Sequence, residues 1–153
     1  DGNGAATWQD TFEPTMAEIF APTTATTNLG TSFGDITMSS NGIIDTGYTE
    51  DNIGITVPED GRYRITFRAT VTVDNNRRSG GEFQLTNNNS VIAGTLAATY
   101  HRNNDAHQSS ATIVKVMDLS ANDVIRAQGR RYSNRGNLRI VGNGTALMVE
   151  RIK

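Results

Sequence analysis

The clearest pattern in the chain is a strict alternation of apolar and polar side chains over residues 62–73. The apolar positions are Tyr63, Ile65, Phe67, Ala69, Val71 and Val73, and arginine or threonine fills every position between them. An extended backbone sends successive side chains to opposite faces, so this pattern predicts a long, half-buried antiparallel strand. Pro58 and Gly61 stand immediately before it and predict a tight turn.

Short apolar runs separated by turn residues continue through the rest of the chain after residue 30. Ten runs can be drawn: residues 33–38, 42–46, 53–57, 62–73, 82–86, 91–100, 111–118, 123–128, 137–141 and 145–152. Asparagine and glycine cluster between them, as in residues 87–89 and 142–144, and both tolerate left-handed turn geometry. The spacing predicts an all-β fold, a ten-stranded jelly-roll sandwich, and not alternating strands and helices.

The first thirty residues have a different pattern. Large apolar side chains recur every four residues, at Trp8, Phe12, Met16 and Phe20. Four is a helical spacing, and Pro14 is suited to a helix start, so we expect a short helix over Thr15–Phe20. Residues 1–30 are then an N-terminal arm or linker, and residues 31–153 form the jelly-roll head domain. Trp8 and Phe12 either cover one end of the core or pack against neighbouring chains or a stalk.

Two of the expected strands carry apolar side chains on both parities. In residues 145–152 and 111–117 neither face is consistently polar. One small sandwich normally leaves its outer faces in water, so a second copy of the chain is the simplest cover. Candidate interface residues are Ala146, Met148, Ile113, Trp8 and Phe12. A covering loop or the N-terminal segment remains the alternative.

Composition and charge exclude some classes of function. The 153 residues are 36% hydrophobic and 20% charged, with a formal net charge of -2. A net negative chain has no global attraction for nucleic acid, and no run approaches the ~18 apolar residues of a membrane helix. The absence of cysteine leaves the redox compartment open. Because the sequence begins at Asp1 without a leader, we expect a piece of a longer protein.

Arginine provides all but two of the fourteen cationic side chains. Its planar group binds carboxylates through paired hydrogen bonds and stacks on aromatic rings, so the bias is compatible with interfaces. A solvated, arginine-rich surface explains it equally well.

Three stretches resemble a known family. Residues 55–67 are similar to the apolar run, proline turn and Gly-x-Tyr-x-Phe-like strand of the globular head shared by tumour necrosis factor (TNF) and complement component one q. Residues 113–125 resemble that family's leucine strand and Gly-Asp-x-Val turn, with Asn122 in place of the glycine, and residues 145–149 resemble its last inner strand. The resemblance implies a ten-stranded jelly roll that assembles as a homotrimer.

Within that fold, the threonine- and asparagine-rich composition without cysteine is more similar to bacteriophage virion proteins and bacterial surface fibres than to animal cytokines. In such proteins the head caps a fibre or spike and meets a host surface. The resemblance therefore implies a virion or extracellular location, with other virion or fibre proteins as partners.

The sequence offers little for catalysis. His101 and His107 flank a polar segment, where we expect solvated loop histidines and not a metal pair. No zinc-binding helix, phosphate-binding glycine loop or nucleophile elbow is present, and the carboxylates are scattered. We therefore expect no enzyme, no cofactor and no metal, although a calcium site built from loop oxygens stays open.

The sequence supports a binding function better than a catalytic one. Residues 100–107 and 129–137 are polar stretches rich in arginine, tyrosine and asparagine, which make adaptable recognition surfaces, and Arg77 and Arg78 form a third basic tip. Candidate ligand-binding residues are Arg130, Arg131, Tyr132, Asn134, Arg135, Tyr100, His101, Arg102, Arg77 and Arg78. The expected ligand is a saccharide or an acidic surface polymer. The alternatives are ordinary hydrophilic hairpin tips and arginines that pair across subunits.

Two functional hypotheses follow. The first is a non-enzymatic trimeric head that attaches to a host-cell glycan or protein through exposed loops, with avidity from three sites on one head. The second is a structural capsid or decoration protein without a receptor-binding role. A carbohydrate-active enzyme is a third alternative.

Overall fold

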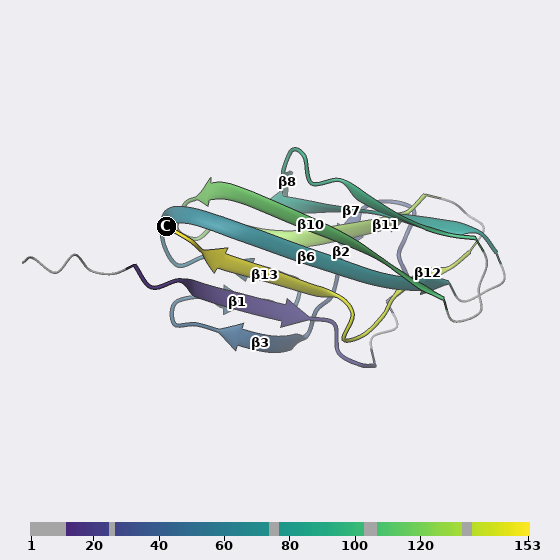
Figure 1. The fold of residues 1–153 in the computed structure, drawn as a ribbon, viewed down its shortest axis with the longest axis horizontal. Helices are drawn as coiled ribbons and strands as arrows, with labels where there is room; N and C mark the ends of the chain where they lie inside the picture. Colours follow the sequence, from purple (N-terminus) through teal and green to yellow (C-terminus); the bar gives the residue numbers. More distant parts are fainter. Residues whose placement is uncertain (1–11, 25–26, 74–76, 103–106, 133–135) are drawn as a thin grey trace, which may run out of the picture.

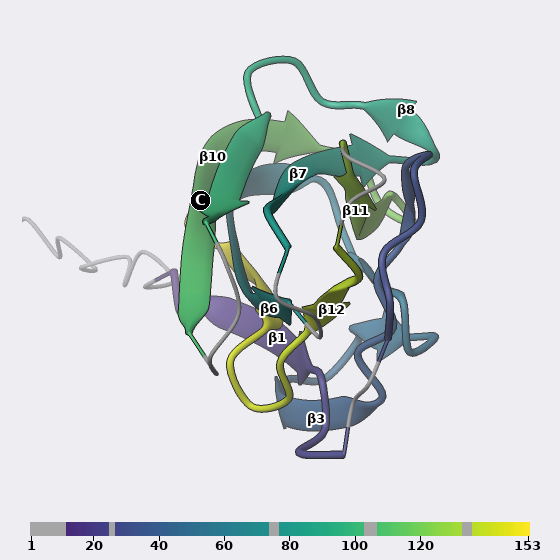
Figure 2. The ribbon, with the colours of Figure 1, turned by 90° about the vertical axis from the view of Figure 1, so that its right-hand side faces the viewer.

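The computed structural model describes residues 12–24, 27–73, 77–102, 107–132 and 136–153. Within these ranges the chain forms thirteen strands and no helix, arranged as two antiparallel sheets packed face to face (Figures 1 and 2). The predicted all-β jelly roll is confirmed, but the strand count is thirteen and not ten.

Sheet A contains six strands, in the order β10-β6-β13-β1-β3, with β12 paired to β6 beyond the end of β13. Their bounds are β1 (Thr15–Phe20), β3 (Ser40–Ile44), β6 (Gly61–Val73), β10 (Gln108–Leu119), β12 (Leu138–Ile140) and β13 (Ala146–Arg151). Sheet B has the order β4-β5-β11-β7-β8, with β2 paired to β11 and β9 to β7. Its strands are β2 (Gly34–Asp35), β4 (Thr49–Glu50), β5 (Gly54–Thr56), β7 (Ser79–Asn87), β8 (Ser90–Val91), β9 (Ala97–His101) and β11 (Val124–Arg131).

The predicted alternating strand is β6, the longest strand of the described structure. Its odd-numbered side chains from Tyr63 to Val73 are buried, while Arg64 and Arg68 on the other face are exposed. The turn before it is also present, and the Tyr63 hydroxyl donates to the carbonyl of Glu59 at 2.8 Å. Burial raises the pKa of Tyr63 to about 12, so this hydroxyl remains a donor.

The predicted N-terminal helix is wrong, because Thr15–Phe20 is strand β1. It pairs with β13 on one side and β3 on the other, and Ala17 and Ile19 point into the core with no exposed area. A spacing of four fits a helix, but it also keeps Met16 and Phe20 on one face of a strand, since four is a multiple of two. Backbone pairing with β13 and with β3 then stabilises the segment as a strand.

Two other predicted strands are reshaped, and one strand was not predicted. Residues 91–100 divide into β8 and β9, because Gly94 between them adopts φ +78° and turns the chain. Residues 33–38 contribute only the two-residue β2, and β4 was not anticipated. The residues that do form strands keep the predicted alternation of buried and exposed side chains. The buried core therefore largely matches the prediction.

The core lies between the sheets and is almost wholly apolar. Phe67 of β6 and Phe83 of β7 meet across it with ring centroids 6.2 Å apart and ring planes inclined by 51°. Tilted ring pairs of this kind contribute beyond the burial of their area. Ile65, Leu85 and Ile125 surround them without exposed surface.

Thr70 marks the place where β6 changes partner from β13 to β12. Its amide donates to Thr145 Oγ1 at 3.0 Å, and the Thr145 hydroxyl donates to the Thr70 carbonyl at 3.2 Å. The Thr70 hydroxyl in turn donates to the Gly144 carbonyl at 2.7 Å. These bonds give the buried backbone partners where regular pairing is interrupted.

His101 connects the two sheets. Although its strand belongs to sheet B, its Nε2 lies 3.1 Å from the carbonyl of Val71 in sheet A, and Ser109 Oγ of β10 lies 3.1 Å from the same nitrogen. The side chain is 4% exposed, so the expected solvated loop histidine is wrong for this residue. Burial lowers its pKa, only partly opposed by the bond to Val71.

We expect the stability of the fold to fall at mildly acidic pH through His101. A pKa lowered in the folded state means that the neutral ring is favoured there, so this contribution is complete above the unfolded pKa of about 6.5 and declines as the pH falls below it. Urea unfolding at pH 5, 6 and 7 should show a shallower pH dependence for His101→Gln than for the natural chain. His107→Gln, at an exposed histidine, is the control, and equal slopes for all three proteins would contradict the assignment.

We also expect Gly142→Ala to destabilise the fold. A Cβ at this position would overlap the carbonyl oxygen of Pro22 and lie 2.8 Å from its carbon, and backbone atoms cannot move aside as the end of a side chain can. The cost should be about 1–3 kcal/mol. Gly34→Ala is the matched control, since its Cβ would meet nothing within 4 Å and should change stability by less than about 0.5 kcal/mol. Equal denaturation midpoints for the two variants would refute this reading.

Candidate functional site

The fold brings the three predicted recognition stretches to one end of the molecule. The register pairs Ser79 with His101 and Gly81 with Arg131, so the start of β7 and the ends of β9 and β11 lie together. We call this the loop end. In Figure 1 it lies opposite the C-terminus and the start of β1, and Thr15 pairs with Arg151 at that other end.

The candidate ligand-binding residues fall into groups. Tyr100, Arg102, Arg77, Arg78 and Tyr132 are exposed or partly exposed at the loop end. Asn134 and Arg135 lie outside the described residues. His101 faces inward as described above, so its ring is not offered to a ligand.

Tyr132, Gly80 and Tyr100 form a row across the outer face of sheet B. Gly80 pairs with Tyr100 of β9, and the amide of Tyr132 donates to the Gly80 carbonyl. A Cβ on Gly80 would lie 2.6 Å from the Tyr132 ring, so only glycine lets that ring lie across the strand. The Tyr132 hydroxyl then donates to the Thr99 carbonyl at 3.3 Å. Tyr132 and Tyr100 nevertheless remain 50% and 59% exposed.

Arg130 and Arg131 are held within the protein. Arg130 Nε donates to Glu82 at 2.6 Å, and its guanidinium lies 4.5 Å from the centroid of the Phe33 ring. Arg131 donates to the Gly136 carbonyl at 3.1 Å and to Asn137 Oδ1 at 3.2 Å. These contacts orient both arginines and occupy several of their donors. The alternative given above was that the arginines pair across subunits, whereas Arg130 pairs with Glu82 of its own chain.

Arg77, Arg78 and Arg102 differ in this respect. All three are exposed, and none has a carboxylate partner among the described residues. Arg78 precedes Gly80 by two positions and Arg102 follows Tyr100 by two, next to the paired strand ends. The loop end therefore combines two exposed tyrosines with guanidinium groups available to an anion.

The sequence did not identify Gly80 or Glu82 as part of this surface. A signal was present, since Ser79-Gly80-Gly81 stands at the start of a run with buried Phe83 and Leu85. Glycine inside a strand marks a close approach by another group. Which group approaches depends on the register between β7 and β11, and that is not visible in the sequence.

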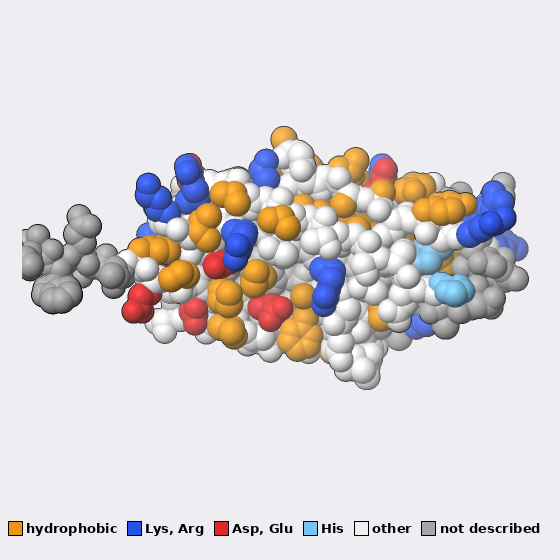
Figure 3. All heavy atoms as spheres, viewed as in Figure 1, with side chains coloured by type: hydrophobic (Ala, Val, Ile, Leu, Met, Phe, Trp, Pro, Cys, Tyr) orange, Lys and Arg blue, Asp and Glu red, His pale blue; other side chains and the backbone are white. Residues whose placement is uncertain are grey.

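The outer face of sheet A carries the candidate interface. Met148 stands in one row with Thr66 of β6 and Val114 of β10. Val114 and Val116 are 59% and 49% exposed, and Ala146 and Met148 are half-buried. Figure 3 shows apolar side chains gathered on this face among several charged ones. Arg64 and Glu150, which form an ion pair, are neighbours on β6 and β13 of the same face.

The other candidate interface residues lie elsewhere. Ile113 points into the core and is 5% exposed, so its neighbours Val114 and Val116 take its place on the surface. Phe12 is 43% exposed at the terminal end, where the Arg151 guanidinium lies 5.4 Å from its ring centroid. Trp8 lies outside the described residues.

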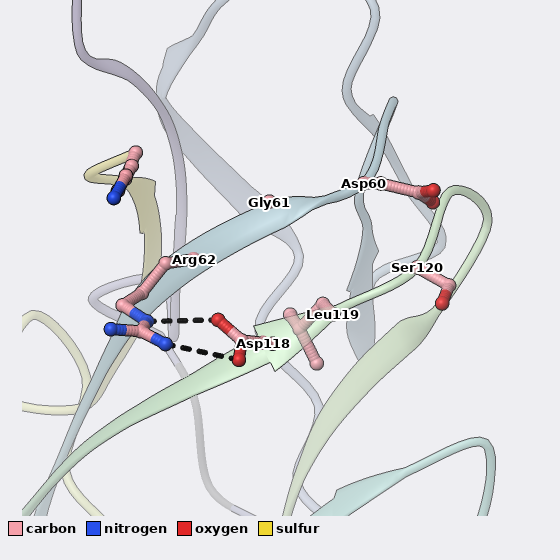
Figure 4. A pocket seen from close by; sticks show the side chains of 7 residues that line it. Asp60, Gly61, Arg62, Asp118, Leu119 and Ser120 are labelled. Atoms are coloured by element: carbon pink, nitrogen blue, oxygen red, sulfur yellow. Dashed lines mark hydrogen bonds and ion pairs between the residues drawn. The ribbon is translucent and has the colours of Figure 1, made fainter.

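A shallow cavity of about 380 Å³ lies at the terminal end (Figure 4). Arg62 Nε and Nη2 donate to the two carboxylate oxygens of Asp118 at 2.8 and 3.1 Å, and these bonds lower the pKa of Asp118. Asp60 and Lys153 complete a lining of mixed charge. Exposed pairs of this kind are screened by water and contribute little to stability.

The described residues hold no evident catalytic arrangement. Ser109 Oγ lies 3.1 Å from His101 Nε2 and 3.4 Å from Nδ1. The carbonyl of Val71 can only accept, so Nε2 carries the proton, and no hydrogen bond from His101 to a carboxylate completes a triad among the described residues. Nowhere in the described ranges do three or more histidine and carboxylate side chains gather around a possible metal position. Nor do these residues include a helix that could span a membrane.

Comparison with known proteins places the fold. No family model matches the sequence, and no curated protein matches it. Among solved structures, murine APRIL superposes with a TM-score of 0.62 at 13% identity, over 92% of this chain and 100% of that one. The Eiger TNF from S. frugiperda gives 0.65 at 9% identity, over 93% and 94%. The resemblance to TNF-like heads is thus confirmed for the fold: the chain is a TNF-like jelly roll along nearly its whole length.

Proposed function

We propose that this chain is the non-enzymatic, trimeric head of a virion or surface fibre and that it attaches to a host-cell surface saccharide through its loop end. The observation that carries the proposal is the separation of surfaces. Two exposed tyrosines lie at one end beside Arg77, Arg78 and Arg102, both ends of the described chain lie at the other, and a partly exposed apolar face lies between them.

This arrangement suits a multivalent attachment device. A stalk joined at the terminal end leaves the loops of every copy directed away from it. Three copies packed through the outer face of sheet A would hold three weak sites at fixed separations, which raises avidity without any new contact.

The trimer is supported by the character of that face. Val114, Val116 and Met148 form an apolar strip with charged residues around it, as in the centre and rim of a protein interface. Arg64 and Glu150 are already paired within the chain, so they could enter an interface without an unpaired charge.

We expect the purified protein to have three times the 16.5 kDa mass of one chain at micromolar concentration, measured by light scattering after size exclusion. Val114→Arg should give single chains with an unchanged circular dichroism spectrum, because a new charge on the strip repels its partner. Val91→Arg is the matched control, since Val91 is 60% exposed on β8 of sheet B and should leave the trimer intact. A monomeric natural chain would refute the assembly.

The second expectation concerns attachment. Labelled trimer should bind to cells of the natural host or to a glycan array, and replacing Arg77, Arg78 and Arg102 together with glutamine should reduce binding at least tenfold. The Val114→Arg variant should also bind more weakly, about 100-fold or more, through lost avidity. Arg62→Gln, at an exposed arginine of the terminal end outside both the loop end and the apolar strip, serves as the control.

The alternative of a capsid or decoration protein gives a different result in the same assay. Such a protein would bind assembled capsids in fixed stoichiometry and would bind neither cells nor glycans. Turnover of any polysaccharide would refute both readings.

A further inference from the structure

The outer face of sheet B changes character along its length. Away from the loop end its polar side chains bond to one another: Gln84 donates to Gln128 at 2.9 Å, and Gln128 donates to Asp35 at 2.9 Å. Arg126 likewise binds Asp51 at 3.0 Å. Groups that already satisfy one another gain little from an added ligand.

The row of Tyr132, Gly80 and Tyr100 interrupts this pattern. It borders the Arg130–Glu82 pair on one side and the positions of Arg78 and Arg102 on the other. Two tyrosines that are at least half exposed thus stand between a neutralised pair and guanidinium groups without a described carboxylate partner.

Gly80 makes Tyr132 a prepared contact surface. The ring lies over the glycine and its hydroxyl is fixed to the Thr99 carbonyl, so little side-chain freedom remains to be lost on binding. A cavity of about 290 Å³, lined by Thr31, Arg130, Arg131 and Tyr132, opens beside the ring. It offers space for a substituent of a ligand that lies on the row.

We propose that this row, together with Arg78 and Arg102, binds a carboxylate-bearing oligosaccharide. The tyrosine rings contact the apolar faces of the sugars, and the guanidinium groups pair with the carboxylates. Tyr132 and Tyr100 originate two strand spacings apart, about 10 Å, so the fitting ligand is a short oligomer and not a single sugar. The inference rests on the proposed attachment function and specifies its ligand.

Charge distinguishes this ligand from other classes. A neutral sugar would leave Arg78 and Arg102 unused. A nucleic acid carries a phosphate at every residue and requires a basic groove along its path, whereas here the neighbouring Arg130 is neutralised by Glu82 and the chain is net negative. Charge on one side of an aromatic row suits a ligand with separated apolar and anionic parts.

The test uses the purified 153-residue protein and calorimetric titration with hexamers of galacturonic acid and of sialic acid, each compared with its carboxyl-reduced form. We expect at least one acidic hexamer to bind ten times more tightly than its reduced form. Tyr100→Ala and Tyr132→Ala should each weaken binding about tenfold, and the double variant Arg78→Gln, Arg102→Gln should remove the preference for the acidic form. Leu96→Ala and Arg62→Gln, exposed residues outside the row, should leave it unchanged.

Equal binding of acidic and reduced hexamers, no binding of either, or equally tight binding of a dodecamer of thymidylate would overturn the inference. A cell-adhesion assay then distinguishes failure of this inference from failure of the proposed attachment function. Adhesion that neither acidic hexamer inhibits leaves attachment standing and refutes the ligand. If a hexamer binds but the protein adheres to no cell, the attachment function is refuted and the proposed oligosaccharide site stands.

Discussion

The pairing of β6 on both of its edges is the constraint on which the rest of the structure depends. Every position from Gly61 to Thr72 pairs with β10, while the other edge pairs first with β13 and then with β12. The two threonines Thr70 and Thr145 satisfy the backbone where one partner gives way to the other. Because one face of β6 is buried, a shift of a single residue would turn Phe67 to solvent and Arg68 into the core, so the register is strongly fixed.

That register determines the positions of the candidate surfaces. With β6 and β10 aligned, the end of β6 and the start of β10 lie together, and the start of β7 and the ends of β9 and β11 lie together in sheet B. His101 joins the sheets at this end through the Val71 carbonyl. The candidate recognition residues therefore adjoin the paired ends of β7, β9 and β11, and residues next to paired strands are held more precisely than residues within a long loop.

Sequence patterns predicted much of the fold and less of the site, for physical reasons. Period-two alternation shows which side chains of β6 are buried, and apolar runs bounded by turn residues allowed β10, β11 and β13 to be placed. It cannot decide between helix and strand where apolar residues recur every four positions, as at Met16 and Phe20, because both structures place them on one face. His101 looked solvated among asparagines, since the carbonyl that binds it belongs to a strand thirty positions earlier. Ile113 and Val114 are adjacent apolar residues, and only the register shows which one faces outward.

The arginine bias acquires a physical meaning once partners are known. Arg62, Arg64, Arg126, Arg130 and Arg151 each lie against a carboxylate of another segment, so they connect strands and turns across the outside of the sandwich. A lysine at position 62 would supply the charge, but it lacks the planar guanidinium group through which Arg62 donates two hydrogen bonds to Asp118. Arg68 and Arg131 instead donate to backbone carbonyls, of Gly144 and Gly136. Arg77, Arg78 and Arg102, which have no carboxylate partner among the described residues, lie beyond the ends of β7 and β9. Under the proposed function the same residue type has two roles: arginines beside a carboxylate connect segments of the fold, and the exposed arginines at the loop end bind the ligand.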